Sequence, residues 1–176
     1  MKKATVLLVL VLLLCACAPV PAVDVTPAKV FYAGEPGGVK TALDLAVQSG
    51  MVTLVDDISN AQTLVLNGLI PDGAAERVAS GAGLVLILGE EITDTQAGAL
   101  LGKPVSLLAA NDAVSLTDTE SASDSLLTEI IWNGAPQVRE RSALSGLDTD
   151  WTPLVSAFES DEGFLYQLPE NKFVIT

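Results

Sequence analysis

The sequence GAGLVLILG, residues 81–89, decides the fold class of this chain. Its residues 84–88 are all aliphatic and show no alternation of polar and apolar side chains. An unbroken run of this kind is typical of a strand that is buried on both faces of a sheet. We therefore expect 84–88 to be a central strand of a mainly parallel sheet.

Before this run, short aliphatic segments alternate with segments of helical period. Apolar residues recur at helical spacing over 39–47, which predicts a helix that ends at Gly50. Asp72 is placed to cap a second helix over 74–79. The alternation indicates an α/β domain. Strands are expected at 30–32, 51–55, 63–69 and, after the central run, 105–108.

A further helix is predicted after the central strand, because TDTQ at 93–96 has the form of a capping box. Ile92 is available as its hydrophobic staple, and the helix should end at Gly102. Together these elements predict a flavodoxin-like three-layer sandwich over residues 29–176, with a mainly parallel sheet and a C-terminal antiparallel extension.

The C-terminal third is predicted to consist of a loop followed by strands. Residues 112–125 are rich in Ser, Thr and Asp and are expected to form an exposed loop, followed by a buried helical turn over 126–131. An edge strand is predicted at 138–144, with Arg139 and Arg141 on its outer face. Antiparallel strands are expected at 153–158, 163–168 and 172–175. The sequence stops at Thr176, directly after strand-like residues, so we expect the domain to be part of a longer protein.

The first residues indicate export. Lys2 and Lys3 precede an apolar run over 4–14, which is too short for a membrane span of about 20 residues. The following LCAC, residues 14–17, resembles the lipobox of bacterial lipoproteins and makes Cys17 the residue to be lipidated. We predict a signal peptide over 1–16 and a Pro-rich tether over 17–28 that holds the domain near the membrane.

This anchor would place the protein in the cell envelope, on the extracytoplasmic face of a bacterial membrane. Attachment through two or more acyl chains is what stable anchoring requires. The alternative is cleavage after Ala18 or Ala22, which would give a soluble secreted protein. Both cysteines of the chain, Cys15 and Cys17, lie in this region, so no disulfide is predicted for the folded domain.

The charge of the chain argues against nucleic acid as a partner. Without Lys2 and Lys3, seven basic residues remain against twenty-two acidic ones, a net charge of −15. Binding to nucleic acid or to anionic lipid needs clustered Lys and Arg. The chain also contains no histidine, which removes the commonest general base and metal ligand.

The order of predicted elements, with TLVLNG at 63–68 and GAGLVLILG at 81–89, resembles the class I glutamine amidotransferase-like superfamily. The likeness is greatest to non-catalytic members in bacterial envelope proteins, and DSLL at 124–127 and WNGAP at 132–136 are similar to later segments of such proteins. Working members of this superfamily carry a Cys nucleophile on the turn after the central strand, with a His and an acid further along.

That turn reads LGEEI here, residues 88–92, with no Cys, Ser or His. The resemblance therefore implies that the fold is kept and the glutaminase activity is lost. We predict a non-enzymatic binding or interaction module, without a cofactor, whose partners are the membrane through its lipid and a protein of the envelope. A solute-binding lipoprotein is less consistent with the length, because such proteins usually need two lobes around a cleft.

Two acidic pairs are candidate metal ligands. Glu90 and Glu91 follow the central strand, and Asp56 and Asp57 follow the second strand, so all four lie where open α/β sheets bind ligands. Ca²⁺ or Mg²⁺ prefers such carboxylates, and a metal-binding protein or carboxylate-dependent hydrolase is the alternative function. The structural alternative for Glu90 and Glu91 is the first turn of the following helix, where its dipole favours acids. For Asp56 and Asp57 the alternative is a solvated turn.

Two other features have a functional and a structural interpretation. The glycines of residues 34–38 follow the first strand, but their spacing fits neither a dinucleotide-binding motif nor a P-loop, so a tight turn is expected. Trp132 and Trp151 could stack on a sugar or anchor a partner, and core or edge packing is the structural alternative.

Overall fold

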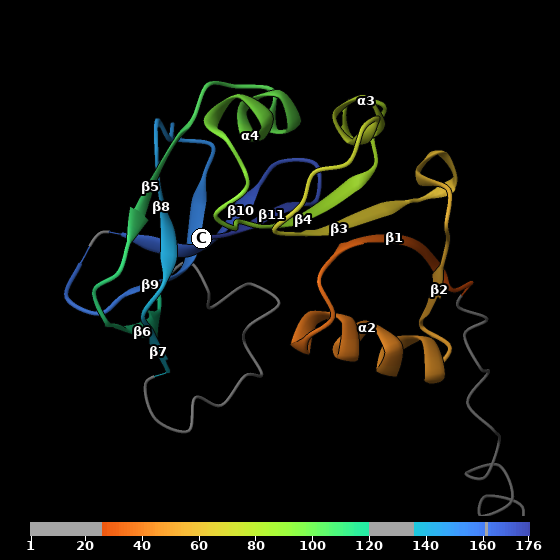
Figure 1. Cartoon of the computed structure of the whole chain (residues 1–176), viewed down its shortest axis with the longest axis horizontal. Helices are drawn as coiled ribbons and strands as arrows, with labels where there is room; N and C mark the ends of the chain where they lie inside the picture. The colour runs from red at the N-terminus through yellow and green to blue at the C-terminus, as the bar shows by residue number, and fades with distance from the viewer. Residues whose placement is uncertain (1–25, 120–135, 161) are drawn as a thin grey trace, which may run out of the picture.

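The computed structural model describes residues 26–119, 136–160 and 162–176. Its main feature is a nine-stranded mixed sheet in the order β2-β1-β3-β4-β11-β10-β9-β6-β7 (Figure 1). One half of this sheet is parallel, with every neighbouring pair of strands running in the same direction. Its strands are β1 (Ala28–Gly34), β2 (Val52–Leu54), β3 (Thr63–Asn67), β4 (Gly83–Ile87) and β11 (Lys172–Ile175).

The other half of the sheet is antiparallel, and a two-stranded ribbon lies beside it. This arrangement confirms the predicted α/β fold of flavodoxin-like type with an antiparallel extension. The antiparallel strands are β6 (Val114–Asp118), β7 (Gln137–Val138), β9 (Thr152–Ala157) and β10 (Gly163–Leu168), and the ribbon consists of β5 (Ser106–Ala110) and β8 (Arg141–Ser145).

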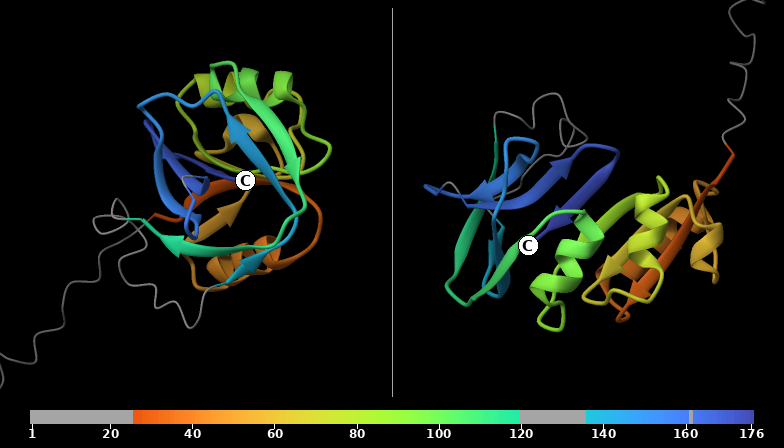
Figure 2. Two further views of the ribbon diagram at one scale, coloured as in Figure 1. Left: turned by 90° about the vertical axis from the view of Figure 1, so that its left-hand side faces the viewer. Right: turned by 90° about the horizontal axis from the view of Figure 1, so that it is seen from above.

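The helices lie on both sides of the parallel half (Figures 1 and 2). Helices α3 (Ala74–Ala79) and α4 (Asp94–Leu101) cover one face and pack against each other. Helix α2 (Gly38–Gln48) lies on the opposite face, next to β2. A short 3-10 helix, η1 (Ile58–Asn60), connects β2 to β3. Among the described residues, no helix combines the length and apolarity that a membrane crossing requires.

The main cluster of the core occupies one face of the sheet, and Val30 and Val65 are buried on the other face. Leu64 and Leu66 of β3, Leu84 and Leu86 of β4, and Val174 of β11 are fully buried beneath α3 and α4. On the opposite face the alternating residues of β4 are half-buried, and no residue of α2 is fully buried. The prediction that 84–88 is a central strand is confirmed, whereas its burial on both faces is wrong for the face that carries α2.

Helix capping follows the predicted pattern at one helix and departs from it at another. At α4, the Thr93 side chain accepts a hydrogen bond from the Gln96 N–H, and the Gln96 side chain accepts one from the Thr93 N–H, so the capping box is confirmed. At α3, Gly73 rather than Asp72 occupies the N-cap, with φ of 82° and no side-chain cap. The Asp72 cap is wrong because the chain enters α3 through a left-handed residue, which glycine adopts without strain.

Two predictions for the C-terminal third are corrected by the structure. Part of the expected loop 112–125 is strand β6, which pairs with β7 and β9. The expected edge strand 138–144 is divided between β7 and β8, and the side chain of Arg141 is buried instead of facing outward. Both errors arise because these strands are short and their hydrogen-bond partners lie far away in the chain.

Strand β11 occupies an unexpected position. It pairs antiparallel with β10, as predicted, but it also pairs parallel with β4, from Lys172–Leu84 to Ile175–Ile87. The end of the chain is therefore built into the centre of the sheet. The predicted signal peptide, Cys17, most of the tether, the helical turn 126–131 and Trp132 lie outside the described residues.

Candidate functional site

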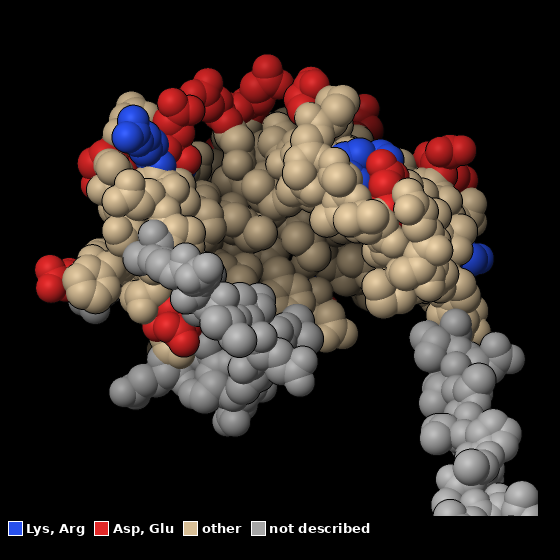
Figure 3. Space-filling model, turned by 90° about the horizontal axis from the view of Figure 1, so that it is seen from below, with Lys and Arg blue, Asp and Glu red and all other residues tan. Residues whose placement is uncertain are grey.

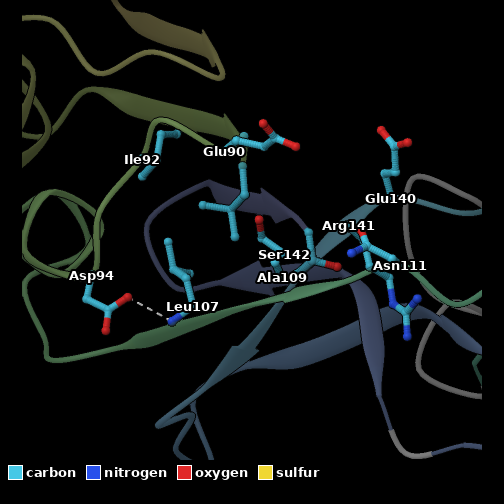
Figure 4. Close-up of a pocket in the computed structure, with 12 residues that line it drawn as sticks. Glu90, Ile92, Asp94, Leu107, Ala109, Asn111, Glu140, Arg141 and Ser142 are labelled. Atoms are coloured by element: carbon cyan, nitrogen blue, oxygen red, sulfur yellow. Dashed lines mark hydrogen bonds between the residues drawn. The ribbon is translucent and has the colours of Figure 1, made fainter.

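A pocket of about 600 Å³ lies at the carboxyl ends of β4 and β11. The ribbon formed by β5 and β8 provides its other wall (Figure 4). Its apolar lining comes from residues such as Leu88, Ile92 and Leu107. The polar lining consists of Glu90, Asp94, Asn111, Glu140, Arg141, Ser142 and Thr176. This edge is the place where open α/β sheets bind ligands.

The turn after β4 positions Glu90 at the pocket. Leu88 N–H donates to the carbonyl of Ile175 (2.8 Å), which ties the turn to β11, and Ile92 N–H donates to the carbonyl of Gly89 (3.1 Å). A Cβ at Gly89 would lie 2.8 Å from the Cα of Gly68, so the close approach of the loops after β3 and β4 requires glycine at position 89.

Asp94 fixes the distance between α4 and the ribbon. Its carboxylate accepts a hydrogen bond from Leu107 N–H (2.9 Å) and another from the Ser106 hydroxyl (3.2 Å) (Figure 4). As a residue of the first turn of α4, it also interacts favourably with the helix dipole. Asp94 thus has a structural role in the wall of the pocket.

Arg141 is the buried cation behind the pocket. Its guanidinium makes a two-point ion pair with Glu162, Nε to Oε1 at 2.7 Å and Nη2 to Oε2 at 3.0 Å, and its Nη1 lies 3.2 Å from Asp112 Oδ1. The hydrogen bonds to Glu162 are the largest reason that the pKa of Arg141 is raised. The hydrogen bond from Arg141 in turn lowers the pKa of Asp112. Arg141 is therefore engaged on the side of the ribbon away from the pocket centre.

Glu90 and Glu140 extend toward the same side of the pocket mouth, one from the turn after β4 and one from the turn before β8 (Figure 4). Within the described parts of the chain, neither carboxylate takes part in an ion pair with a Lys or Arg. These two groups give the pocket mouth a negative charge, which favours a ligand that donates hydrogen bonds or carries a positive charge.

The structure does not bring the two predicted acidic pairs together. Glu90 and Glu91 follow β4, whereas Asp56 and Asp57 follow β2, and β1 and β3 lie between these strands. Three strand spacings amount to about 14 Å, more than one metal ion can bridge. In the described ranges, no group of three or more Asp, Glu, His or Cys side chains could hold a metal ion.

Asp57 instead stabilises the start of η1. Its Oδ1 accepts a hydrogen bond from Ser59 N–H at 2.9 Å. This backbone hydrogen bond is the largest reason that the pKa of Asp57 is lowered. Asp57 is exposed, in agreement with the solvated turn that the sequence also allowed.

The remaining candidates from the sequence have structural roles. Trp151 is buried, packs edge-on against Tyr166 with ring centroids 5.8 Å apart, and has Lys103 Nζ 5.5 Å from its ring centroid. Core packing therefore describes Trp151. The segment 34–38 forms the turn between β1 and α2, in which a Cβ at Gly34 would lie 2.3 Å from the carbonyl oxygen of Asn67.

Sequence reasoning missed the part of the pocket that comes from the ribbon. Glu140, Arg141 and Ser142 line it, as does Thr176 at the end of β11. A useful signal was present, because ERS at 140–142 places an acid, a base and a hydroxyl together in a predicted strand. These residues lie far from Glu90 in the sequence, so the sequence alone gave no reason to group them with it.

Comparisons with solved structures identify proteins with a similar fold. One is a protein from Thermoplasma acidophilum, described as a putative subunit of GMP synthase. It aligns over 85% of this chain and 82% of its own, with a TM-score of 0.55 and 11% identity. A protein named SMU.1228c aligns over 85% and 75%, with a TM-score of 0.56 and 13% identity.

These likenesses show the fold. The chain shares its α/β architecture with these two proteins. No family model matches the sequence, and no curated protein is significantly similar to it. At 11–13% identity, the likeness carries no activity over to this chain.

Proposed function

We propose that this chain is a non-catalytic binding module of the bacterial cell envelope, held at the membrane by a lipid on Cys17. The observation that carries the proposal is the composition of the pocket at the carboxyl ends of β4 and β11. Its lining includes the carboxylates of Glu90 and Glu140 but neither a Cys nor a His. A pocket of this kind is suited to recognise a ligand rather than to attack an acyl carbon.

Further support comes from the place of the pocket in the fold. In the amidotransferase-like superfamily the nucleophile belongs on the turn after the central strand, and residues 88–92 of this chain hold Glu90 and Glu91 there. Ser142 and Thr176 supply hydroxyls, but the chain has no His to activate them. The ligand class that fits is a small polar molecule with donor groups that face the two carboxylates.

The experiment is to test the purified protein for glutaminase activity and for ligand binding. We expect no release of glutamate from glutamine, and we expect a library of small amines and polar metabolites to contain compounds that raise Tm. Glu140→Gln should abolish that rise, whereas Glu170→Gln, a substitution in the exposed turn between β10 and β11, should not. Turnover of glutamine, or thermal shifts unaffected by Glu140→Gln, would refute the proposal.

The membrane anchor has its own test. Cys17→Ser removes the thiol that would carry the lipid, so the protein should move from the membrane fraction to the soluble fraction. Cys15→Ser is the matched control, because Cys15 would be removed with the signal peptide. Equal membrane partition of Cys17→Ser and the wild type would count against the anchor.

A further inference from the structure

The described chain enters the parallel half of the sheet at one corner. Ala28 N–H, at the start of β1, donates to the carbonyl of Met51 (3.0 Å), and Met51 N–H donates to the carbonyl of Ala46 in α2 (3.0 Å). The start of β1, the end of α2 and the start of β2 therefore lie together (Figure 1). The tether that we expect over 17–28 joins the domain at this corner. We call the end of the parallel half where its strands begin the amino edge, and the opposite end the carboxyl edge.

Exposed apolar side chains gather at this corner. Among the described residues, six large apolar side chains are well exposed, and three of them, Leu45, Val47 and Met51, lie at the end of α2 and the start of β2. Leu45 and Met51 are 60% and 62% exposed. The other three lie on separate elements, namely Leu69 after β3, Leu108 on β5 and Phe158 after β9. Hydrated apolar area is unfavourable, so this grouping indicates a surface that meets an apolar partner.

The turns of the amino edge contain no acid near the tether. The turns that lead into β1, β2, β3 and β4 are residues 26–27, 49–51, 61–62 and 80–82. Lys29, the second residue of β1, is exposed beside them. Arg77, in the last turn of α3, donates from Nε to the carbonyl of Ala61 (2.9 Å). On α2, Asp44 is paired with Lys40. This part of the amino edge is therefore not acidic, although the chain as a whole is.

The carboxyl edge is acidic. The turns after β1, β3 and β4 contain no Lys or Arg and four acids, Glu35, Asp72, Glu90 and Glu91. On the surface, acidic side chains gather along one rim of the molecule (Figure 3). A seven-residue strand such as β1 is about 23 Å long, more than twice the screening length of about 8 Å at physiological salt. A charged surface that touches one edge therefore acts mainly on that edge, and the net charge of the whole chain does not decide whether the amino edge can approach it.

A lipid surface suits this corner better than a second copy of the chain. A stable protein interface buries about 800 Å² on each partner, to which three apolar side chains contribute only part. Insertion into the headgroup region of a bilayer needs less apolar area when a tether keeps the domain close, because the tether raises the effective concentration to about the millimolar range. The expected tether over 17–28 reaches about 35 Å, which allows this corner to touch the membrane.

We propose that the amino edge docks on the surface of the lipid bilayer, with Leu45 and Met51 inserted at the level of the headgroups and Lys29 next to the lipid phosphates. The carboxyl edge, and with it the pocket at the ends of β4 and β11, then faces away from the membrane. The pocket therefore takes its ligand from the aqueous phase of the envelope rather than from the bilayer. This inference rests on the proposed anchor at Cys17 and adds the side of the domain that meets the membrane.

The test uses the lipidated full chain in vesicles of phosphatidylglycerol and phosphatidylcholine. Cys15 and Cys17 are the two cysteines of the chain, so once Cys17 carries its lipid and Cys15 is removed, an introduced Cys is the sole free thiol and can be labelled with the fluorophore NBD. Ser49→Cys places the label at the amino edge and Asp72→Cys at the carboxyl edge, both at exposed positions. Lipids with a spin label on the acyl chain should quench NBD at position 49 about twofold or more and leave NBD at position 72 unchanged.

Variants then identify the side chains that dock. Leu45→Glu together with Met51→Glu should abolish the quenching at position 49. The matched control is Leu108→Glu together with Phe158→Glu, whose sites are as exposed, at 63% and 59%, but lie on other elements, and it should leave the quenching unchanged. Circular dichroism checks that both double variants are folded.

The charge of the amino edge has a separate measurement. Lys29→Glu should weaken the quenching at position 49 on vesicles that contain phosphatidylglycerol, because an acid there is repelled by anionic headgroups. The difference between Lys29→Glu and the wild type should shrink in raised salt and on vesicles of phosphatidylcholine alone. The same loss on both kinds of vesicle would contradict the role of Lys29.

Several results would overturn the inference. They are equal quenching at positions 49 and 72, no quenching at either, and quenching at position 49 that survives Leu45→Glu with Met51→Glu. A dimer in detergent that this double variant dissociates would also overturn it, since the occupant would then be a second copy. A mature chain without lipid on Cys17 refutes the anchor and this inference with it. The thermal-shift and glutaminase tests of the pocket use no membrane, so failure of the docking leaves them unaffected.

Discussion

The two faces of the parallel half differ in what covers them, although the same strands form both. Along β4, Leu84 and Leu86 are fully buried under α3 and α4, while Val85 and Ile87 on the other side are half-buried. Residues of one strand with nearly the same hydrophobicity therefore have different surroundings. The comparison shows that an aliphatic sequence alone does not tell which side of a strand is fully buried. Among the described residues, α3 and α4 bury one side of β4 completely.

The largest effect should come from comparing neighbouring residues of β4. Leu86→Ala removes a fully buried side chain and should lower the free energy of unfolding by about 2–5 kcal/mol, because it leaves a cavity. Ile87→Ala, on the half-buried side of β4, should cost about 1 kcal/mol, since less apolar area returns to water. Denaturant unfolding measures both. Equal losses would mean that the two faces are equally packed.

A smaller effect should follow from removing one buried hydroxyl on the covered side. The Tyr166 hydroxyl accepts a hydrogen bond from Gly163 N–H at 3.0 Å, and Tyr166→Phe would leave that buried donor without a partner. We expect a loss of about 1–3 kcal/mol in the free energy of unfolding. Phe173→Leu, a control at a half-buried residue on the other side of the sheet, should cost less, and the reverse order would contradict the comparison.

Tyr166 also predicts a pH dependence. Burial is the largest reason that the pKa of Tyr166 is raised above its usual 10.0, so the folded state holds the phenolic proton more tightly than the unfolded state. The resulting stability is fully present below pH 10 and is lost as the pH rises through the raised pKa. Thermal melts between pH 8 and about 11 should therefore show a steeper fall in Tm for the wild type than for Tyr166→Phe. Parallel curves would show that the phenol does not contribute.

The smallest effect is expected from adding metal ions, at the acidic residues that follow β2 and β4. Glu90 and Glu91 are separated from Asp56 and Asp57 by two strands, so Ca²⁺, Mg²⁺ or Mn²⁺ should give no heat in calorimetric titration and a Tm shift below about 1 °C. Saturable heat that Glu90→Gln removes would restore the metal hypothesis. Asp72→Asn, an exposed acid next to α3, is the matched control.

Prediction succeeded where a local pattern was sufficient. The capping box at Thr93 and Gln96 was confirmed because its hydrogen bonds join residues three apart. The strands 163–168 and 172–175 were confirmed with their bounds, since tight turns flank them. For the candidate site, only the position of Glu90 was predicted, because it follows directly from the strand before it.

Prediction failed where distant segments pair. Arg141 was expected on an outer face, yet its side chain is buried in an ion pair with Glu162, the residue before β10. This contact joins segments that are distant in the sequence, so no local pattern predicts it. Strand β6 was assigned to a loop because the surrounding residues 112–125 are rich in Ser, Thr and Asp, and its hydrogen bonds come from the distant strands β7 and β9. Such strands are defined by their partners more than by their own residues.

The sequence by itself determined that 84–88 is an inner strand, that helices alternate with parallel strands, and that the chain contains no histidine. Only the tertiary structure decided that β11 lies beside β4, that Glu140 and Thr176 join Glu90 around one pocket, and that Leu84 and Leu86 are more deeply buried than Val85 and Ile87. The physical reason is range. Hydrophobic period and capping act between residues a few positions apart, whereas strand order and the coverage of a face depend on packing between segments far apart in the chain.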